Sequence, residues 1–467
     1  MAIFIILLQF LLYSNAEKDM FVYPTILQER TSETNLVVRL NDKFTLHLER
    51  SSVLADKLLF VTTSEEVNHL EEVETSAIQE TLYHDTHYQS SVRVHQRDDT
   101  VKVEGIINHK LRIKPVPEGE RSFQGQILHK IYEVKETEER FINMEMKGPS
   151  SNSSLKQNTI SSRTSNGDVF QVELHIISDR KHQGYFDKNE DLIGYMAVFM
   201  NAVNLRYLDM AQPKVRFLLV GLTRRKEEPF SKDNGGTTDT TETLSKLEKY
   251  EQEGRVPSKH DALFLVTGLD LVKETNGKLE KNVAGRAFMG TVCSTYGVGV
   301  GEDTATTYLG VAVAAHELAH ILGSDHDTTP RCPWKEGYLM SYVDGGTRKY
   351  RLSPCSEDSI RNTYGRLSEE CKKVLSKTNY MSQHKEYPGE TVREKYFCRK
   401  RVESVVKGLQ VKVFPLKTPA DAKNCKMQCC YWQGNTRTCR STKMLERMAC
   451  SKHGKTCKRG VCAEHEW

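Results

Sequence analysis

Cysteine is absent from the first 292 residues of this 467-residue chain, and all 12 cysteines lie between Cys293 and Cys462. No disulfide can therefore form within the first 292 residues. After the first 16 residues, no run of 18 uncharged apolar residues occurs, so no membrane-spanning helix is expected. The chain is 38% hydrophobic and 27% charged, which is typical of a globular protein long enough for two or three domains.

The two ends of the chain indicate a secreted, extracellular protein. Ile3 to Leu12 is a short apolar run, and the small residues Ser14-Asn15-Ala16 follow it. This pattern predicts a signal peptide over residues 1–16, although it lacks a basic start and a buried N-terminal strand is the alternative. Eight cysteines within residues 398–462 predict a disulfide scaffold. Their pairing stays open, because eight cysteines allow 105 connectivities.

One segment combines residues that bind a metal. It reads His316-Glu317-Leu318-Ala319-His320-Ile321-Leu322-Gly323-Ser324-Asp325-His326-Asp327. Residues four apart share a helix face, so His316 and His320 can bind one ion. Gly323 can adopt a left-handed conformation that ends the helix and returns the chain, which makes His326 a third ligand.

Three protein ligands leave one tetrahedral position open, which is typical of a catalytic zinc site rather than a structural one. Glu317 follows the first ligand and can reach a water molecule at the open position. A bare His-Glu-x-x-His also occurs as ordinary surface or core histidines. The added Gly323, His326 and Asp327 favour the metal site.

The segment resembles the reprolysin (adamalysin) family of the metzincin clan, because Asp327 follows the third histidine. Gly285 to Cys293 and Leu352-Ser353-Pro354-Cys355-Ser356 are also similar to family segments, and the likeness covers residues 166–380. Met340, fourteen residues after His326, matches the methionine turn. Tyr342 stands where astacin-type relatives carry a metal-facing tyrosine, but Asp327 argues against an astacin, so Tyr342 is interpreted as structural.

The resemblance implies roles for named residues. His316, His320 and His326 are expected to bind one Zn²⁺, and Glu317 is expected to be the catalytic base. The disulfides implied are Cys293 with Cys371 and Cys332 with Cys355. Glu173 and Asp261 match two calcium ligands of the family, but Val374 replaces an expected asparagine, which leaves Ca²⁺ binding undecided.

The fold class expected is α/β. Strands at 169–179, 214–221 and 262–268 alternate with helical patterns at 187–209 and 309–322, which indicates an α/β layer structure. The family resemblance implies that the sheet is mixed, mostly parallel and twisted, with long helices. Together with the resemblance, this divides the chain into a signal peptide (1–16), a β-rich propeptide (17–165), a metzincin catalytic domain (166–383) and a small disulfide-rich, basic domain (384–467).

The propeptide would keep the enzyme a zymogen, but it offers no cysteine to occupy the metal. Its end, residues 148–167, is rich in Ser, Asn and Thr, contains the glycosylation sequon at Asn152, and shows no dibasic cleavage site. This composition predicts a linker open to proteolysis and a glycoprotein. Latency, if present, would have to be steric or use another ligand.

The tail, residues 384–467, is strongly basic. It has 19 Lys and Arg against 8 Asp and Glu, a net charge of +11, whereas the whole chain has +4. Such charge attracts acidic glycans or acidic protein surfaces, although a merely soluble basic domain fits equally well. Integrin capture through Arg-Gly-Asp is excluded because the triplet is absent, and nucleic acid is not expected as a partner of a secreted chain.

The function expected is a secreted zinc endopeptidase that hydrolyses extracellular proteins by a Glu-assisted zinc-water mechanism. The chain's size, basic tail and cysteine-free propeptide are similar to salivary reprolysins of blood-feeding ticks, which implies host haemostatic or matrix proteins as substrates. The alternative is a binding protein that acts through its cysteine-rich basic domain, with a latent catalytic domain.

Overall fold

The computed structural model describes three parts of the chain, which we call the N-terminal region (19–134), the central region (169–376) and the tail (394–464). Short gaps in this description fall at 28–34, 65–66, 98–99, 117–125, 228, 231–232, 276–277, 282, 404–411, 434–435, 446, 452–453 and 459. The expected signal peptide, the sequon at Asn152 and the linker at 148–167 lie outside the described residues. No described helix is long and apolar enough to cross a membrane.

The N-terminal region forms a nine-stranded sheet in the order β1-β11-β10-β9-β8-β7-β4-β3-β2. Its strands pair antiparallel, and the turns follow from local chemistry. Asn41 and Asn108 each accept two backbone N–H bonds within the next three residues, the arrangement that bends a chain after an Asn. The strands are β1 (Met20–Val22), β2 (Thr25–Ile26), β3 (Asn35–Arg39), β4 (Thr45–Arg50), β7 (Leu82–Asp85), β8 (Ser90–Arg97), β9 (Thr100–Ile106), β10 (Leu111–Pro115) and β11 (His129–Glu133).

The central region is built on a seven-stranded mixed sheet in the order β18-β19-β15-β12-β13-β5-β6. Five neighbouring strands, from β19 to β5, run parallel, and the two outer strands run antiparallel to their neighbours. The expected mixed, mostly parallel sheet is therefore present. Its strands are β5 (Leu54–Ser64), β6 (Val67–Glu74), β12 (Val169–Ser178), β13 (Lys214–Arg225), β15 (Ala262–Thr267), β18 (Gly285–Ala287) and β19 (Val298–Glu302).

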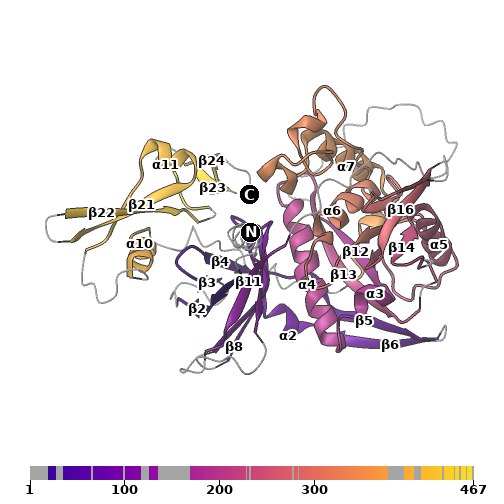
Figure 1. The fold of residues 1–467 in the computed structure, drawn as a ribbon. Helices are drawn as coiled ribbons and strands as arrows, with labels where there is room; N and C mark the ends of the chain where they lie inside the picture. The colour runs from indigo at the N-terminus through magenta and orange to yellow at the C-terminus, as the bar shows by residue number, and fades with distance from the viewer. Residues whose placement is uncertain are drawn as a thin grey trace, which may run out of the picture.

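Two strands of this sheet come from the N-terminal region. The hairpin β5–β6 leaves the N-terminal sheet and pairs with β13, where Leu222 lies opposite Phe60. Figure 1 shows these indigo strands continuing the sheet below the magenta helices. The boundary expected at residue 165 therefore does not separate two independent sheets.

Helices cover the central sheet, and the expected long helix is α4 (Asn189–Arg206). Acidic Glu190 and Asp191 lie in its first turn, where they favour the helix dipole. The other helices of the N-terminal and central regions are α2 (Ser76–Gln79), α3 (Arg180–Gln183), α5 (Thr240–Gln252), α6 (Gly310–Ile321), α7 (Pro354–Arg366) and α8 (Glu369–Lys372), with the 3₁₀ turns η1 (Trp334–Glu336) and η2 (Gly346–Tyr350) and a small sheet of β14 (Thr237–Asp239), β16 (Asp270–Thr275) and β17 (Lys278–Glu280).

The burial of α4 differs from the sequence pattern. Apolar residues such as Leu192, Met196 and Phe199 recur as on one helix face, yet 14 of the 18 helix residues are buried. The reason is that α4 packs on β13 of the central sheet and also on β7, β8 and β9 of the N-terminal sheet. Leu208, which falls within the helical pattern expected at 187–209, lies beyond the helix end and is 37% exposed.

The tail has its own disulfide-linked core, as the cysteine density predicts. Its four disulfides join Cys398 to Cys429, Cys425 to Cys457, Cys430 to Cys439, and Cys450 to Cys462. Phe397, Met427 and Met448 pack among these cysteines. The elements are α10 (Glu394–Glu403), β20 (Phe414–Leu416), α11 (Pro419–Lys423), β21 (Lys426–Gln433), β22 (Thr436–Lys443), β23 (Thr456–Lys458) and β24 (Val461–Ala463).

Candidate metal centre

The three histidines of the central motif converge at the end of α6. His316 and His320 lie one turn apart on this helix, and His326 returns from the loop that follows it. One potential ligand atom from each ring lies within 4.8 Å of those of the other two. The chain can turn because Gly323 has a φ of +101°, a conformation that costs glycine little.

Backbone carbonyls fix the orientation of two of these rings. His316 Nδ1 donates to the Leu339 carbonyl oxygen at 2.9 Å, and His320 Nδ1 donates to the Ser324 carbonyl oxygen at 2.8 Å. A carbonyl oxygen can only accept, so each Nδ1 carries the hydrogen and each neutral ring keeps its lone pair on Nε2. His316 Nε2 lies 3.1 Å from His326 Nε2. The lone pairs therefore face a common point, an arrangement that fits a divalent cation with imidazole ligands.

Burial keeps the three imidazoles neutral. Desolvation, followed by the neighbouring His320 and His326, lowers the pKa of His316 well below its usual value. Desolvation also lowers the pKa of His320 to about 4 and the pKa of His326 by less. Neutral imidazole is the form that binds a metal, so the site is prepared for one near neutral pH.

Glu317 lies beside the histidines and is only 4% exposed. Burial raises the pKa of its carboxyl to about 8, and the nearby Arg286 acts in the opposite direction. A cation bound by the three imidazoles would lower this pKa further. The strand β18 passes so close that a Cβ at Gly285 would lie 2.7 Å from Glu317 Cγ, which explains the glycine at this position.

A buried aspartate anchors the loop that carries the third histidine. The Asp327 carboxylate accepts hydrogen bonds from the hydroxyls of Ser341, Ser353 and Ser356. Its backbone N–H donates to the Met340 carbonyl oxygen at 3.0 Å. From the sequence, Asp327 served as part of the metal motif and to distinguish families, whereas in the structure it also ties the His326 loop to the Met340 turn and to α7.

Met340 is completely buried below the histidines, in the turn whose Leu339 carbonyl orients His316. The Tyr342 ring lies 4.9 Å from the His326 ring, centroid to centroid. Arg286, which the sequence analysis includes only within the segment from Gly285 to Cys293, interacts electrostatically with Glu317. Arg286 on β18 and Glu317 on α6 are 31 residues apart in the chain, so no local pattern could indicate that they lie close together.

Two disulfides close the central region. Cys293 pairs with Cys371 and Cys332 pairs with Cys355. These are the two pairs that the family resemblance implied. A second group of potential ligands, Cys425, Cys450 and Cys457, is already committed to disulfides of the tail.

The two calcium candidates are neighbours, but backbone groups occupy much of their bonding capacity. The Glu173 carboxylate accepts from the backbone N–H groups of Leu375 and Ser376 at 3.0 and 2.7 Å. Asp261 accepts from the backbone N–H of Glu173 at 2.8 Å. Burial raises the pKa of Asp261 to about 6. The pair therefore already stabilises the end of the central region, and Ca²⁺ binding there stays a prediction.

Comparison with known proteins agrees with this geometry. Residues 171–373 match the model of the reprolysin (M12B) family of zinc metalloproteases. This segment of the chain is similar to the reprolysin family. The expected family resemblance is thus confirmed for the segment that contains the three histidines, while the narrower resemblance to tick proteins stays a prediction.

Venom metalloproteinases are among the relatives of this chain, at modest identity. Venom metalloproteinase antarease TserMP_A from Tityus serrulatus is 26% identical over 328 residues, which cover 65% of this chain and 82% of that protein. Venom metalloproteinase BumaMPs1 from Olivierus martensii is 26% identical over a stretch that covers 73% of this chain and 88% of that protein. Metalloproteinase-II from Bacteroides fragilis, a solved structure, is 11% identical, covers 76% of this chain and 94% of its own, and has a TM-score of 0.33, too low to bear on the fold.

The glycine that ends α6 is the first test of this site. We expect Gly323→Ala to lower the melting temperature of the central region by about 5–10 °C. A Cβ at this position would strain the backbone and would also lie only 2.0 Å from Thr363 Oγ1. Zinc affinity should fall as well, since His326 would move. Gly346→Ala is the control: its φ is +66° and its Cβ would meet open space. An equal loss in both variants would contradict the packing argument.

Zinc binding should depend on pH in a defined direction. Since metal binding requires neutral imidazoles, and burial lowers all three pKa values below 6.5, protons should compete only in acid. We expect the apparent zinc affinity to be nearly constant from pH 8 to about 6.5 and to decline as the pH falls toward 4. Competition with a zinc-sensitive dye measures it, and an affinity that rises on acidification would exclude the three-histidine site.

Proposed function

We propose that this chain is a secreted zinc endopeptidase in which His316, His320 and His326 bind the metal and Glu317 is the catalytic base. The observation that carries the proposal is the convergence of three neutral imidazoles beside one buried carboxyl group. The match of residues 171–373 to the reprolysin family supports it independently.

The chemistry divides between the metal and this chain's own residues. When bound, zinc supplies a Lewis acid that polarises a water molecule and the carbonyl group of the scissile peptide. Glu317 takes the proton from the attacking water and later returns it to the leaving amine. The carbonyl groups of Leu339 and Ser324 hold the imidazoles in position throughout.

The strand β18 offers a place for an extended substrate. It is the outermost described strand on this side of the central sheet, and α6 packs directly against it. A peptide could pair with its outer edge by β-strand addition and pass Glu317. This geometry favours cleavage within a chain over removal of a terminal residue, in accordance with an endopeptidase.

Secretion and the division of the chain belong to the same proposal. We assign residues 1–16 to a signal peptide, 17–165 to a propeptide, 166–383 to the catalytic domain and 384–467 to a cysteine-rich basic domain. Six disulfides are consistent with an extracellular location. Substrates would be extracellular proteins, among them host haemostatic or matrix proteins if the tick resemblance holds.

A second candidate function, binding through the tail, is supported by a separate observation. The tail folds around its own core and carries a large positive charge, so it could bind acidic glycans or acidic protein faces while the catalytic domain stays latent. Cleavage of a protein or peptide library with and without a chelator separates the two functions.

The role of Glu317 can be tested without disturbing the metal. We expect Glu317→Gln to keep the fold and one zinc per chain but to lower peptidase turnover by roughly 10²–10⁴-fold, since proton transfer is lost. His320→Ala should instead lose zinc itself. Metal analysis and cleavage of a fluorogenic peptide library measure both effects. Full turnover in the Glu317→Gln variant would disprove the assigned base.

A further inference from the structure

The N-terminal region is joined to the central region through the seven-stranded sheet, to which it contributes β5 and β6. We infer that residues 19–134 are a permanent, noncovalent subunit of the mature protein, which stays bound to the central region and tail after the chain is cut between 148 and 167. This association of the N-terminal region with the central region and the tail does not depend on catalytic activity.

The first support is the strand pairing. β5 is inserted beside β13 as a parallel strand, with Leu54, Phe60 and Val61 opposite Leu219, Leu222 and Thr223. Without β5 and β6, β13 would become an open parallel edge. Its sequence Phe217-Leu218-Leu219-Val220-Gly221-Leu222 is apolar on both faces, which is typical of an internal parallel strand and not of an edge.

The second support is a shared hydrophobic core. Phe60, Ile78 and Leu82 of the N-terminal region belong to the same buried cluster as α4, α6 and the central strands. Leu54 and Leu58 are fully buried in it. Removal of the N-terminal region would expose this core and the second face of α4 to water at once.

The third support is a buried polar contact on α4. Asn201 donates to the Tyr83 carbonyl oxygen at 3.2 Å and to the Ser91 hydroxyl at 3.0 Å, and its side-chain oxygen accepts from the Ser51 hydroxyl. The Ser91 hydroxyl also donates to the Val198 carbonyl oxygen at 2.8 Å. Separation would leave these buried groups without their partners, which is costly.

The N-terminal region also braces the loop that leads into α6. Arg112 Nε donates to the Thr307 carbonyl oxygen at 2.6 Å, and the Tyr132 hydroxyl donates to the Thr306 carbonyl oxygen at 3.0 Å. Thr306 and Tyr308 have φ values of +71° and +58°, which β-branched and aromatic residues rarely adopt. Such a conformation persists only where the surroundings hold it.

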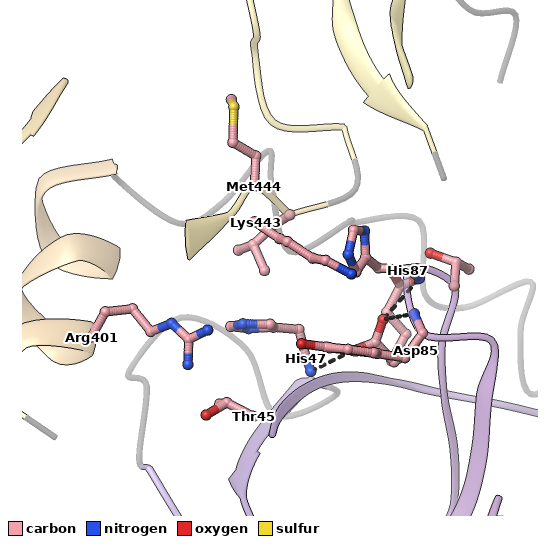
Figure 2. A pocket seen from close by; sticks show the side chains of 11 residues that line it. Thr45, His47, Asp85, His87, Arg401, Lys443 and Met444 are labelled. Atoms are coloured by element: carbon pink, nitrogen blue, oxygen red, sulfur yellow. Dashed lines mark hydrogen bonds between the residues drawn. The ribbon is translucent and has the colours of Figure 1, made fainter. Parts of the chain in front are cut away.

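The same region contacts the tail on its other side. Thr45, His47, Asp85 and His87 face Arg401 and Lys443 of the tail across a cavity of about 20 Å³. Figure 2 shows the Arg401 guanidinium group directed at the His47 ring, with the Lys443 side chain extending toward His87. The His47 and Phe397 rings lie 5.3 Å apart. The N-terminal region therefore connects the central region to the tail.

The strand pairing that attaches the N-terminal region lies at the sheet edge away from the strand beside Glu317. β5 and β6 occupy one edge of the seven-stranded sheet, and β18, which lies beside Glu317, occupies the opposite edge. Retention of residues 19–134 is thus compatible with a substrate that pairs with β18. All cysteines lie from Cys293 onward, so no disulfide can tether the cut fragment and any association is noncovalent.

The test uses the full chain with a site-specific protease sequence inserted between residues 148 and 167. After complete cutting, we expect both fragments to co-elute in size-exclusion chromatography at the position of the uncut protein and to separate on a denaturing gel. Elution of the N-terminal fragment alone, with a soluble remainder that keeps its thermal transition, would overturn the inference. Release accompanied by unfolding or aggregation of the remainder would also overturn it, because the fragment then does not stay bound after the cut.

Two asparagines of α4 provide a matched pair of variants. Asn201 bonds to the N-terminal region, whereas Asn204, three residues on, bonds to the Phe217 backbone of the central sheet at 2.8 and 2.9 Å. In the cut protein, Asn201→Ala should speed loss of the N-terminal fragment on dilution by about tenfold or more. Asn204→Ala should change that rate by less than about twofold. Equal rates in the two variants would contradict the interface described for α4.

Discussion

The burial of α4 on both sides is the constraint on which the rest of the structure depends. One side of this helix rests on the central sheet and the other on the N-terminal sheet, so two sheets and a helix form a single layered body. The Tyr195 hydroxyl of α4 donates to the buried Asp303 carboxylate, which also accepts from the backbone N–H of Gly310, the first residue of α6. The position of the metal helix is thereby linked to the helix that the N-terminal region covers.

Around the histidines, backbone atoms determine the geometry more than side chains do. Carbonyl groups from the Met340 turn and from the end of α6 set the two ring orientations. Asp327 then joins the turn, the third histidine and α7 through hydroxyl groups of Ser341 in the turn and of Ser353 and Ser356 at the start of α7. The strand β18 contributes Gly285, which leaves room for the Glu317 side chain, and Arg286, which interacts electrostatically with it.

Much of the candidate site could be predicted from the sequence because its signals are local. The spacing of His316 and His320, the glycine at 323 and the strands at 169–179 and 262–268 all follow from periodicities of a few residues. The pairs Cys293–Cys371 and Cys332–Cys355 came from the family resemblance instead. The contribution of Asp327 was missed because its partners, Ser341, Ser353 and Ser356, are 14 to 29 residues away.

The parts that could not be predicted are the non-local ones. The apolar residues of α4 have a helical period, but no period shows that a second sheet covers the opposite face. The pairing of β5 with β13 joins residues more than 160 positions apart, such as Phe60 and Leu222. The Glu173 carboxylate accepts from the backbone N–H groups of residues 375 and 376, a contact across 200 residues that no local pattern indicates, and Ca²⁺ binding by Glu173 stays a prediction. In each case, tertiary packing decided the role of a residue that the local pattern left ambiguous.

The hairpin β5–β6 also has a consequence for biosynthesis. At about 5–20 residues per second, the ribosome delivers β13 about 8–30 s after β5, so the apolar strand must wait for its partner. During this interval β6 can already pair with β5 on one side, and its exposed residues include His69, Glu71, Glu72 and Glu74. Charged groups on an edge strand discourage pairing between chains. The acidic outer strand thus protects the newly made hairpin from aggregation until the strand that completes the sheet has been synthesised.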